Sequence, residues 1–297
     1  MKELELKKLV HSTIDNTIKY IFYTEDKLIV EFSYINKNDG KNIICCPVST
    51  FCNIGCKFCH TAEYIGKIKN RNLTSLEISN GVDYIYNDLK LSENPKTLLI
   101  SSMGIGEIVT NVDEVVESMI NIQNTYLKDI YVRFAFATSL PESHKIEFFK
   151  LTNKIAENNL PVKLHLSLHY TTDELRSQWM PMSMKIEPTI AAVDYYKATT
   201  GNDVEIHYAL IENVNDKSED AMRLSNLIKG KGYNVKFLFY NKKDNIDAEP
   251  SNISKIRNFV DIFSLVGIKH EYYVPPGLTI GASCGQLSIN EYIKIKK

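Results

Sequence analysis

Three cysteines stand at the spacing of a metal-cluster ligand set. They are Cys52, Cys56 and Cys59, in the run CNIGCKFC, which has the form CxxxCxxC. Three thiolates on one short loop can bind three corners of a cubane iron–sulfur cluster, and the fourth iron then stays open for a small molecule. The alternative is zinc, although structural zinc usually takes two paired groups of ligands and this stretch holds one. The pattern therefore favours a cluster over zinc or inert thiols.

The other three cysteines fall into two places. Cys45 and Cys46 precede the CxxxCxxC run, and Cys284 follows Cys59 after 225 residues. Spacing this tight makes a poor disulfide framework, and clustered thiols in a reducing compartment more often hold a metal or do redox work. A lone cysteine is usually a buried small apolar residue. The glycines of GLTIGASCG instead predict a loop around Cys284.

Composition limits the class of protein. The 297 residues are 44% hydrophobic and 24% charged, which is enough to bury a substantial core. The formal net charge is -1, so no global basic field indicates a nucleic-acid partner. The start, MKELELKKLV, is not a signal peptide, and no apolar run approaches the roughly 18 residues of a membrane span. We expect a cytoplasmic, monomeric protein that does not contact membranes.

Strand-like and helix-like segments alternate along most of the chain. The segment from residue 19 to 49 reads as strands joined by polar turns. Residues 112–124 carry apolar side chains at the i, i+3, i+4, i+7 spacing of a helix. Thr74 with Glu77, Ser139 with Glu142 and Thr171 with Glu174 have capping-box spacing at helix starts. The later strand candidates are 97–103, 130–138, 162–168, 203–211 and 234–240.

Repeated strand–helix units with short connections predict a parallel sheet with right-handed crossovers. Five or six such units indicate an α/β fold with a complete or partial (β/α) barrel, in which working residues cluster at the strand ends. A doubly wound sheet is less favoured, because cysteines replace the GxGxxG of its first loop. We predict a partial (β/α)6 barrel over residues 42–297, preceded by a short, β-rich extension of helix and strand over residues 1–41.

A set of motifs in order narrows the function. They are CNIGCKFC, RNLTSLEI (71–78), MGIGE (103–107), ATS (137–139), SLH with DELR (167–176), ENVND (212–216), FYN (239–241) and CGQL (284–287). With an aromatic before the last cysteine, the first resembles the radical S-adenosylmethionine (SAM) superfamily. Together, from about Cys45 to Leu287, they resemble the RlmN/Cfr family of methylsynthases, which methylate adenosine in RNA. The resemblance implies a radical SAM barrel, a 4Fe–4S cluster and SAM.

The resemblance also implies site residues. Cys52, Cys56 and Cys59 match the cluster ligands, and the open iron would chelate the amino and carboxylate groups of SAM. Gly104, Gly106 and Glu107 match a SAM-binding strand end, with Glu107 also near the substrate. The residues that match other SAM or active-site contacts are Ser139, Ser167, His169, Asn215 and Asn241.

Several of these residues have a local alternative. The glycines could serve a tight turn, Ser139 could cap a helix, His169 could be a satisfied barrel histidine, and Asn215 could belong to a turn. Their positions at successive strand ends, in family order, favour the functional interpretation.

The resemblance assigns the two remaining thiols to covalent catalysis. A first SAM would methylate Cys284, and a second, split by an electron from the cluster, would yield a radical that takes a hydrogen from that methyl group. The carbon would then add to carbon 2 or 8 of adenine, and a second thiol would release it by forming a disulfide with Cys284. Spacing favours Cys45 as this second thiol, although Cys46 is adjacent. Neighbours on a strand face opposite sides, so only one of the two can face the site.

The substrate and the electron donor are inferred from the family resemblance and from the length of chain before Cys45. Only 44 residues precede Cys45, so we expect the chain to lack the family's N-terminal RNA-contacting domain. The predicted substrate is adenine in RNA. Two alternatives are the same chemistry on a free nucleotide, small metabolite or peptide, and a non-catalytic metal-binding RNA module. The electron donor would resemble flavodoxin or ferredoxin. Local basic clusters (67–71, 229–231, 242–243 and 294–297) are interpreted mainly as solvated surface lysines.

Overall fold

One curved sheet of ten strands runs through the protein, with strand order β1 to β10. The computed structural model describes residues 4–36, 41–93, 97–126, 130–243 and 246–282. The first four strands pair antiparallel, and each strand from β5 to β10 pairs parallel with its predecessor. The strands are β1 (Glu5–His11), β2 (Thr17–Tyr23), β3 (Ile29–Asn36), β4 (Asn42–Cys45), β5 (Leu98–Ser102), β6 (Val132–Thr138), β7 (Val162–Ser167), β8 (Val204–Leu210), β9 (Asn234–Phe239) and β10 (His270–Tyr273).

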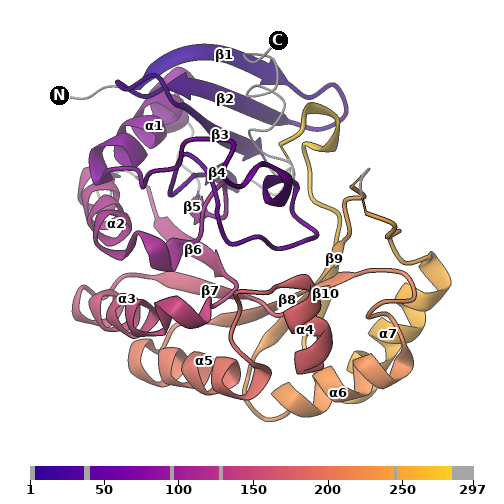
Figure 1. The fold of residues 1–297 in the computed structure, drawn as a ribbon. Helices are drawn as coiled ribbons and strands as arrows, with labels where there is room; N and C mark the ends of the chain where they lie inside the picture. Colours follow the sequence, from indigo (N-terminus) through magenta and orange to yellow (C-terminus); the bar gives the residue numbers. More distant parts are fainter. Residues whose placement is uncertain (1–3, 37–40, 94–96, 127–129, 244–245, 283–297) are drawn as a thin grey trace.

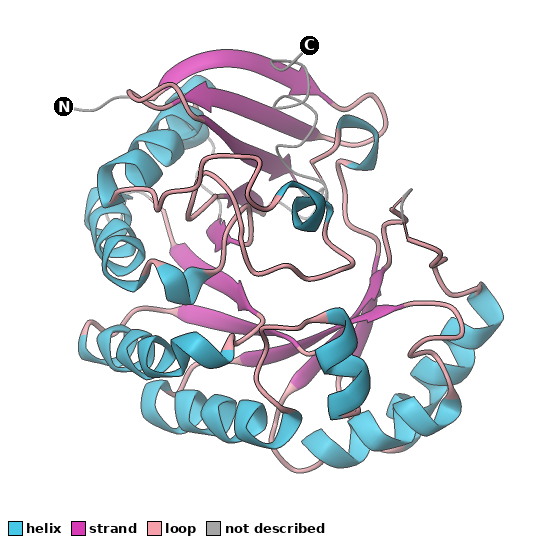
Figure 2. Ribbon diagram, in the orientation of Figure 1, coloured by secondary structure: helices cyan, strands magenta, loops and turns pink. Residues whose placement is uncertain are grey.

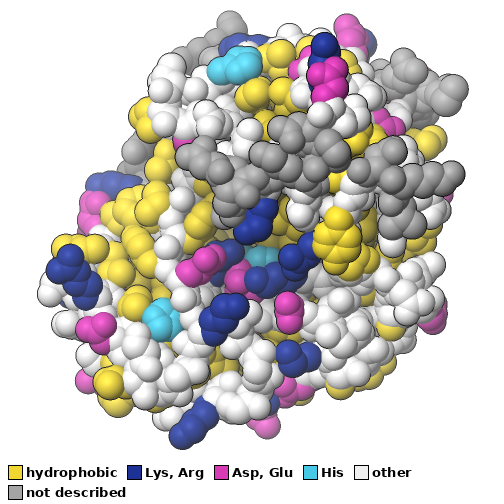
Figure 3. All heavy atoms as spheres, turned by 180° about the vertical axis from the view of Figure 1, so that it is seen from behind, with side chains coloured by type: hydrophobic (Ala, Val, Ile, Leu, Met, Phe, Trp, Pro, Cys, Tyr) yellow, Lys and Arg dark blue, Asp and Glu magenta, His cyan; other side chains and the backbone are white. Residues whose placement is uncertain are grey.

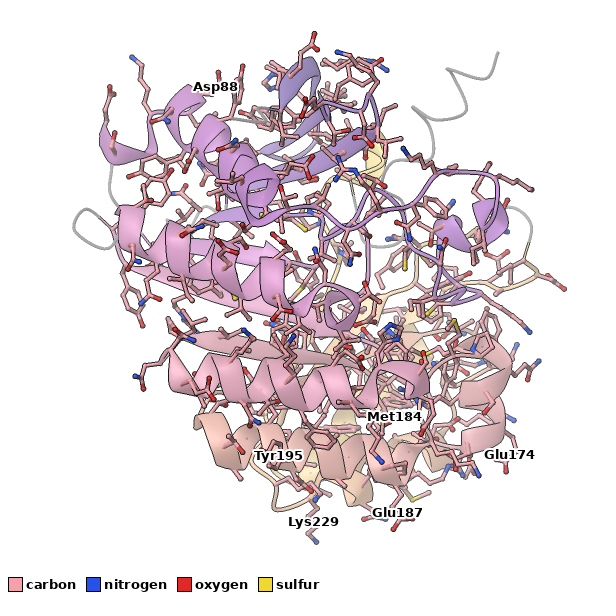
Figure 4. The ribbon with its side chains drawn as sticks, turned by 60° about the vertical axis from the view of Figure 1, so that its left-hand side comes forward. Asp88, Glu174, Met184, Glu187, Tyr195 and Lys229 are labelled. Carbon is pink, nitrogen blue, oxygen red and sulfur yellow. The ribbon has the colours of Figure 1, made fainter. Side chains whose placement is uncertain are left out.

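Helices follow each parallel strand from β4 to β9 and cover the convex side of the sheet (Figures 1 and 2). They are α1 (Ser75–Asp88), α2 (Val112–Tyr126), α3 (Lys145–Glu157), α4 (Asp173–Trp179), α5 (Ile186–Thr200), α6 (Ser218–Ile228) and α7 (Ile253–Leu265). Figure 4 shows how α2, α3 and α5 lie side by side, with Tyr195 and Glu187 of α5 on the outer surface. Among the described residues β10 does not pair with β1, so the sheet is open. The predicted partial (β/α)6 barrel is confirmed.

A single apolar core fills the space between sheet and helices. Side chains that point outward from the strands, such as Ile44, Phe134 and Leu164, pack there against helical residues such as Val115 and Ile155, and all five are at most 1% exposed. The opposite, inward face of the parallel strands is more polar. Side chains on that face therefore line the inside of the barrel and are the ones that can meet ligands.

The N-terminal extension consists of strands over its described residues, and the helix expected within residues 1–41 is not found there. The segment 5–11 extends along β2, and β2 in turn pairs with β3 over seven residues. β2 and β3 bury apolar side chains, and Leu6 and Leu9 of β1 are partly buried against the same core, which a short isolated helix would not achieve. Since β3 also pairs with β4, from Ser33 with Cys45 to Asn36 with Asn42, the extension continues the barrel sheet.

Two of the three predicted helix starts are displaced. Thr74 and Glu77 form the predicted capping box of α1. At α4 the cap is Thr172, whose hydroxyl accepts from the Leu175 amide, while the Thr171 hydroxyl donates to Asp220. Ser139 caps no helix, because its amide and hydroxyl both donate to Glu107. The carboxylate of Glu107, 32 residues away in sequence, binds the Ser139 hydroxyl that the local capping pattern would have used.

Arg71 joins the extension to the barrel. Its guanidinium donates to both carboxylate oxygens of Glu77, at 2.8 and 2.7 Å, and to Asp26 in the β2–β3 turn at 2.7 Å. Hydrogen bonds from Arg71 hold the pKa of Asp26 well below its usual value. Burial by itself would raise the pKa of Glu77, but hydrogen bonds from Arg71 and Thr74 lower it on balance. Arg71 was interpreted as a surface base, but its role here is structural.

Arg71→Met should therefore lower stability at neutral pH and make the fold less sensitive to acid. A carboxylate with a lowered folded-state pKa stabilises the fold above its unfolded pKa of about 4 and loses that contribution as pH falls through the folded pKa. Without Arg71, burial dominates and raises the pKa of Glu77, so the free energy of unfolding should drop by about 2 kcal/mol near pH 7. This deficit should shrink as pH falls toward about 4, because protonation of the buried Glu77 removes the cost of its charge. Urea unfolding between pH 4 and 7 measures this. Lys90→Met, at an exposed ion pair, is the control, and equal pH profiles for the two variants would contradict the role of Arg71.

Candidate active site

A cavity of about 210 Å³ opens at the carboxyl ends of the parallel strands. The segment between β4 and α1, which carries the CxxxCxxC run, forms one wall and crosses the concave side of the sheet in Figure 1. The ends of β5 to β9 form the rest. Of the predicted site residues, these line the cavity: Cys52, Cys56, Cys59, Gly104, Gly106, Glu107, Ser139, Ser167, His169 and Asn241. Segments 190 residues apart in sequence thus meet at one edge of the sheet, as a parallel barrel requires.

The three cysteines of the run gather in this cavity as neighbours. Burial raises the pKa of the Cys52 thiol to about 12, and the nearby Cys59 adds to that rise. Burial also raises the pKa of Cys56 well above its usual value, again reinforced by Cys59 and Cys52. Burial and neighbouring thiols oppose the ionisation of Cys52 and Cys56, and together with Cys59 they form a site that a cationic group would complete.

Cys45 and Cys46 face opposite sides of the sheet, as their alternation predicts. Cys46 is fully buried in the apolar core, and its thiol donates to the Ile44 carbonyl. Cys45 lies on the inward face, in register with Ser33 on one side and Ser101 on the other, and is partly exposed. Cys45 does not line the cavity itself. Of the two adjacent thiols, only Cys45 is placed on the face where the site lies.

Cys284 lies outside the described residues. The described chain ends at Ala282, which packs against Ile105 and beside Cys52. The segment before it is tied to the N-terminal extension, because the Gly277 amide donates to Asp15 at 2.8 Å. The last described residues therefore stand next to the cysteine loop.

Glu107 is the acidic group of the cavity. Its Oε2 accepts from the Ser139 amide at 2.9 Å and from the Ser139 hydroxyl at 2.8 Å, while Oε1 has no hydrogen-bond partner among the described residues. Burial raises the pKa of this carboxyl, and the bonds from neighbouring groups such as Ser139 only partly offset that rise. A buried carboxylate oxygen without a partner is a position where a ligand donor would bind.

The side chain of Asn215 supports the backbone around His169, whereas the prediction made both residues ligand contacts. His169 has a left-handed backbone (φ 56°), and its Nδ1 accepts from the Ala209 amide at 3.0 Å. Burial lowers the pKa of His169 to about 3, so the ring is neutral and carries its proton on Nε2. Asn215 does not line the cavity. Its side chain binds the His169 and Ala209 carbonyls and the Ile211 amide, so it holds the strained His169 turn in place.

Arg176 is a positioning residue whose role the sequence did not reveal, although it belongs to the DELR motif. Its guanidinium, 1% exposed, donates to carbonyls from several strand ends and loops. These acceptors are the carbonyl oxygens of Ser139, Ser167, Leu168 and Met184, the last labelled in Figure 4. The ends of β6 and β7 are thereby fixed to α4. From the sequence alone, an arginine in a helix is expected at the surface. The carbonyl groups that accept its hydrogen bonds come together only in the folded chain.

Lys243 is a second such residue, and its interpretation as a surface lysine was wrong. It is 2% exposed, and its ammonium donates to the Lys57 and Cys59 carbonyls at 3.3 and 3.0 Å and pairs with Glu63 at 3.0 Å. The β9 end thus clamps the cysteine loop. His60 is half-buried at the start of a 3-10 helix in the same loop.

The two predicted glycines are required by close packing of the β5 end against the segment after β4. A Cβ at Gly104 would lie 2.7 Å from the Cys46 carbonyl oxygen. At Gly106 the φ is +110°, and a Cβ would lie 2.4 Å from the Ser49 hydroxyl. Both positions line the cavity as well, so the backbone here can approach a ligand closely.

Comparison with known proteins identifies the family. No protein-family model matches the chain. It is 34% identical over 286 residues to the probable dual-specificity RNA methyltransferase RlmN of Dictyoglomus turgidum, covering 95% of this chain and 79% of that protein. The protein of the same name from Caldanaerobacter subterraneus subsp. tengcongensis is 34% identical over 296 residues, 99% of this chain and 82% of that one. The chain belongs to the RlmN family.

A solved structure agrees with this assignment. The structure of a radical SAM methyltransferase from Sphaerobacter thermophilus superposes on this chain with a TM-score of 0.84 and 26% sequence identity. The match covers 96% of this chain and 81% of that one. The predicted family, fold and enzyme class are confirmed: the protein is a radical SAM methyltransferase. No helix among the described residues is both long and apolar enough to cross a membrane.

The residues present fit the cofactors of this class, a 4Fe–4S cluster and SAM. Three neighbouring thiols, two of them with pKa values raised by burial and by each other's proximity, match a group that binds thiolates and supplies positive charge. The partnerless Oε1 of Glu107 and the close backbone approach at Gly104 and Gly106 lie in the same cavity. Cys52, Cys56 and Cys59 would hold the cluster, and the strand ends would hold SAM beside it.

Lys243→Met should loosen the cysteine loop and with it the cluster. Groups that hold metal ligands in place typically change metal affinity by 10- to 100-fold, so chelator should remove iron about tenfold faster from the reconstituted variant. Lys242→Met is the matched control, because the neighbouring Lys242 is half-exposed and pairs with Glu249 instead. Equal rates of iron loss in the two variants would rule out the clamp.

Proposed function

We propose that this RlmN-family enzyme methylates carbon 2 or carbon 8 of adenine in RNA, through a methyl group carried on Cys284. The proposal rests on the position of the last described residues, which lie next to the cysteine loop. Ala282, two residues before Cys284 in sequence, packs beside Cys52 of the cysteine loop and against Ile105 of the β5 end. The names of the relatives, RNA methyltransferases, support RNA as the substrate class.

The residues would share the work as follows. Cys284 takes a methyl group from one SAM, losing its thiol proton and leaving S-adenosylhomocysteine. The cluster, when bound, supplies the electron that splits a second SAM, and that electron comes from an external donor of the flavodoxin or ferredoxin kind. The role of the chain is to bind and orient SAM through Glu107, Ser139 and the glycines, and to keep water out of a cavity lined mainly by apolar and backbone groups.

Release of the product would fall to Cys45. After the carbon on Cys284 has joined the ring, the adduct would give up one electron to the oxidised cluster and the ring carbon would lose its proton to a base. The Cys45 thiolate then attacks the Cys284 sulfur, so that a disulfide forms and the carbon leaves with the electrons of the C–S bond. That carbon takes up a proton and becomes the methyl group of the product, and a reductant later restores both thiols. Position on the inward face supports Cys45 for this role, and burial in the core makes Cys46 a bystander.

The test uses anaerobically reconstituted protein, methyl-labelled SAM, a reductant and either ribosomal RNA or total tRNA. Mass spectrometry should find label on Cys284 and on adenosine of one RNA, together with 5′-deoxyadenosine. Cys284→Ala should abolish the transfer. Cys45→Ala should accumulate a covalent protein–RNA adduct, because the C–S link can no longer be cleaved.

Cys46→Ala is the matched control and should turn over without an adduct, with folding checked by thermal unfolding because Cys46 is fully buried. Label on Cys284 without any labelled RNA would overturn the RNA substrate and keep the chemistry. An absence of label on Cys284 in protein that contains the cluster and cleaves SAM would falsify the methyl-cysteine route.

A further inference from the structure

A second cavity lies at the opposite end of the barrel, where the parallel strands begin. Its volume is about 380 Å³. Residues from or just before every strand from β4 to β10 line it, so it is the interior of the barrel opened from behind. Figure 3 views the molecule from that side and shows basic, acidic and histidine side chains gathered near the middle of the face. The methyltransferase chemistry proposed above uses none of these residues.

The lining is unusually charged for a barrel interior. Inward positions at this level are generally filled by bulky apolar side chains. Here β6 contributes Arg133, β7 contributes Lys163 and His165, β8 contributes Glu205, and β9 contributes Lys236. The floor is buried, because the His165 and Glu205 side chains are 7% and 6% exposed. Charged groups placed at such a depth need partners of opposite charge.

The acidic side chains of the cavity are already neutralised. Glu205 accepts from Lys163 at 2.5 Å and from Lys236 at 2.8 Å, and Lys236 also pairs with Glu271 at 2.9 Å. The cavity therefore holds two carboxylates against five cationic side chains, an excess of three positive charges before any histidine is counted. The five are Lys41, Arg133, Lys163, Lys236 and Lys269.

Two of these cations are available for a ligand. Neither Arg133 nor Lys269 has an ion-pair partner in the described part of the chain, and both are exposed at the cavity wall. Lys163, whose ammonium has three donors, uses one on Glu205. An arginine fork and ammonium groups that line one cavity are side chains of the kind that recognise phosphate oxygens.

A metal ion is a poorer match for the same cavity. His165, Glu205 and His207 offer ligand atoms within 4.8 Å of one another. However, two ammonium groups already bind the Glu205 carboxylate, one of them on Oε1, the oxygen nearest both imidazoles. A divalent cation there would face two fixed positive charges at short range. Anion binding agrees with the charge of this cavity, and cation binding opposes it.

We propose that the rear cavity is a binding site for a small phosphate-bearing anion of the di- or triphosphate class, separate from the SAM cavity. Its phosphates would contact Arg133 and Lys269 at the wall and the spare donors of Lys163 deeper inside. Glu205 would hold Lys163 and Lys236 in position. A cavity of this size favours a small ligand over a long polymer.

The test measures binding of inorganic triphosphate by isothermal titration calorimetry at moderate ionic strength. This probe has no adenosine, so it cannot imitate SAM. The double variant Arg133→Gln, Lys269→Gln should bind about tenfold more weakly or worse than the wild type, because two charge-assisted contacts are lost. The matched control, Lys145→Gln with Arg257→Gln, removes the same two charges from exposed positions on α3 and α7 and should bind as the wild type does.

Equal weakening in the two double variants would overturn the proposal, since it would show general surface attraction only. Failure of the wild type to bind triphosphate would overturn it as well, as would stronger binding of a short single-stranded RNA that the Arg133, Lys269 variant retains. SAM binding, measured in parallel, should be unchanged in all variants. A defect there bears on the front cavity and the proposed function, so the two proposals can fail separately.

Discussion

The arrangement of the site depends on one buried cation, the guanidinium of Arg176. It binds carbonyls that follow β6 and β7, together with the loop that leads into α5. Burial lowers its pKa to about 10, which still leaves it charged near neutral pH. Because its acceptors are strand-end carbonyls, the same bonds that satisfy the charge fix where Ser139 and Ser167 stand. Removing the charge would leave those carbonyls without donors and the cavity wall without its support.

Three further contacts hold ligand-facing groups in place through bonds between residues far apart in sequence. Asn215 fixes the left-handed turn at His169, Lys243 holds the cysteine loop to the end of β9, and Ser139 directs Glu107. Each spans 30 residues or more of sequence and ends on a backbone group or a carboxylate. Groups that face the ligand are thus held by groups that do not, which is how a site keeps its geometry while water is excluded.

The sequence predicted the fold well because its signals were local. Alternating strands, one amphipathic helix and the order of motifs are sufficient for a parallel barrel, and the CxxxCxxC spacing is sufficient to locate the cysteine loop. The failures have a common cause. Ser139 as a cap and Lys243 as a surface base were judged from neighbours in sequence, whereas their actual partners lie 32 and 184 residues away. Arg176 could not be recognised, because carbonyl acceptors have no sequence signature.

The hydrogen bond between Asp15 and Gly277 can form only when nearly all of the described chain has been synthesised. It joins residues 262 positions apart and ties the last described segment to the first hairpin. At ribosomal rates of about 5–20 residues per second, the cysteine loop is synthesised on the order of tens of seconds before Cys284. The loop can therefore acquire its metal while the thiol that would later carry a methyl group does not yet exist. Separation along the chain thus becomes separation in time, because the contact between Ala282 and the cysteine loop can form only after the strands between them have been made.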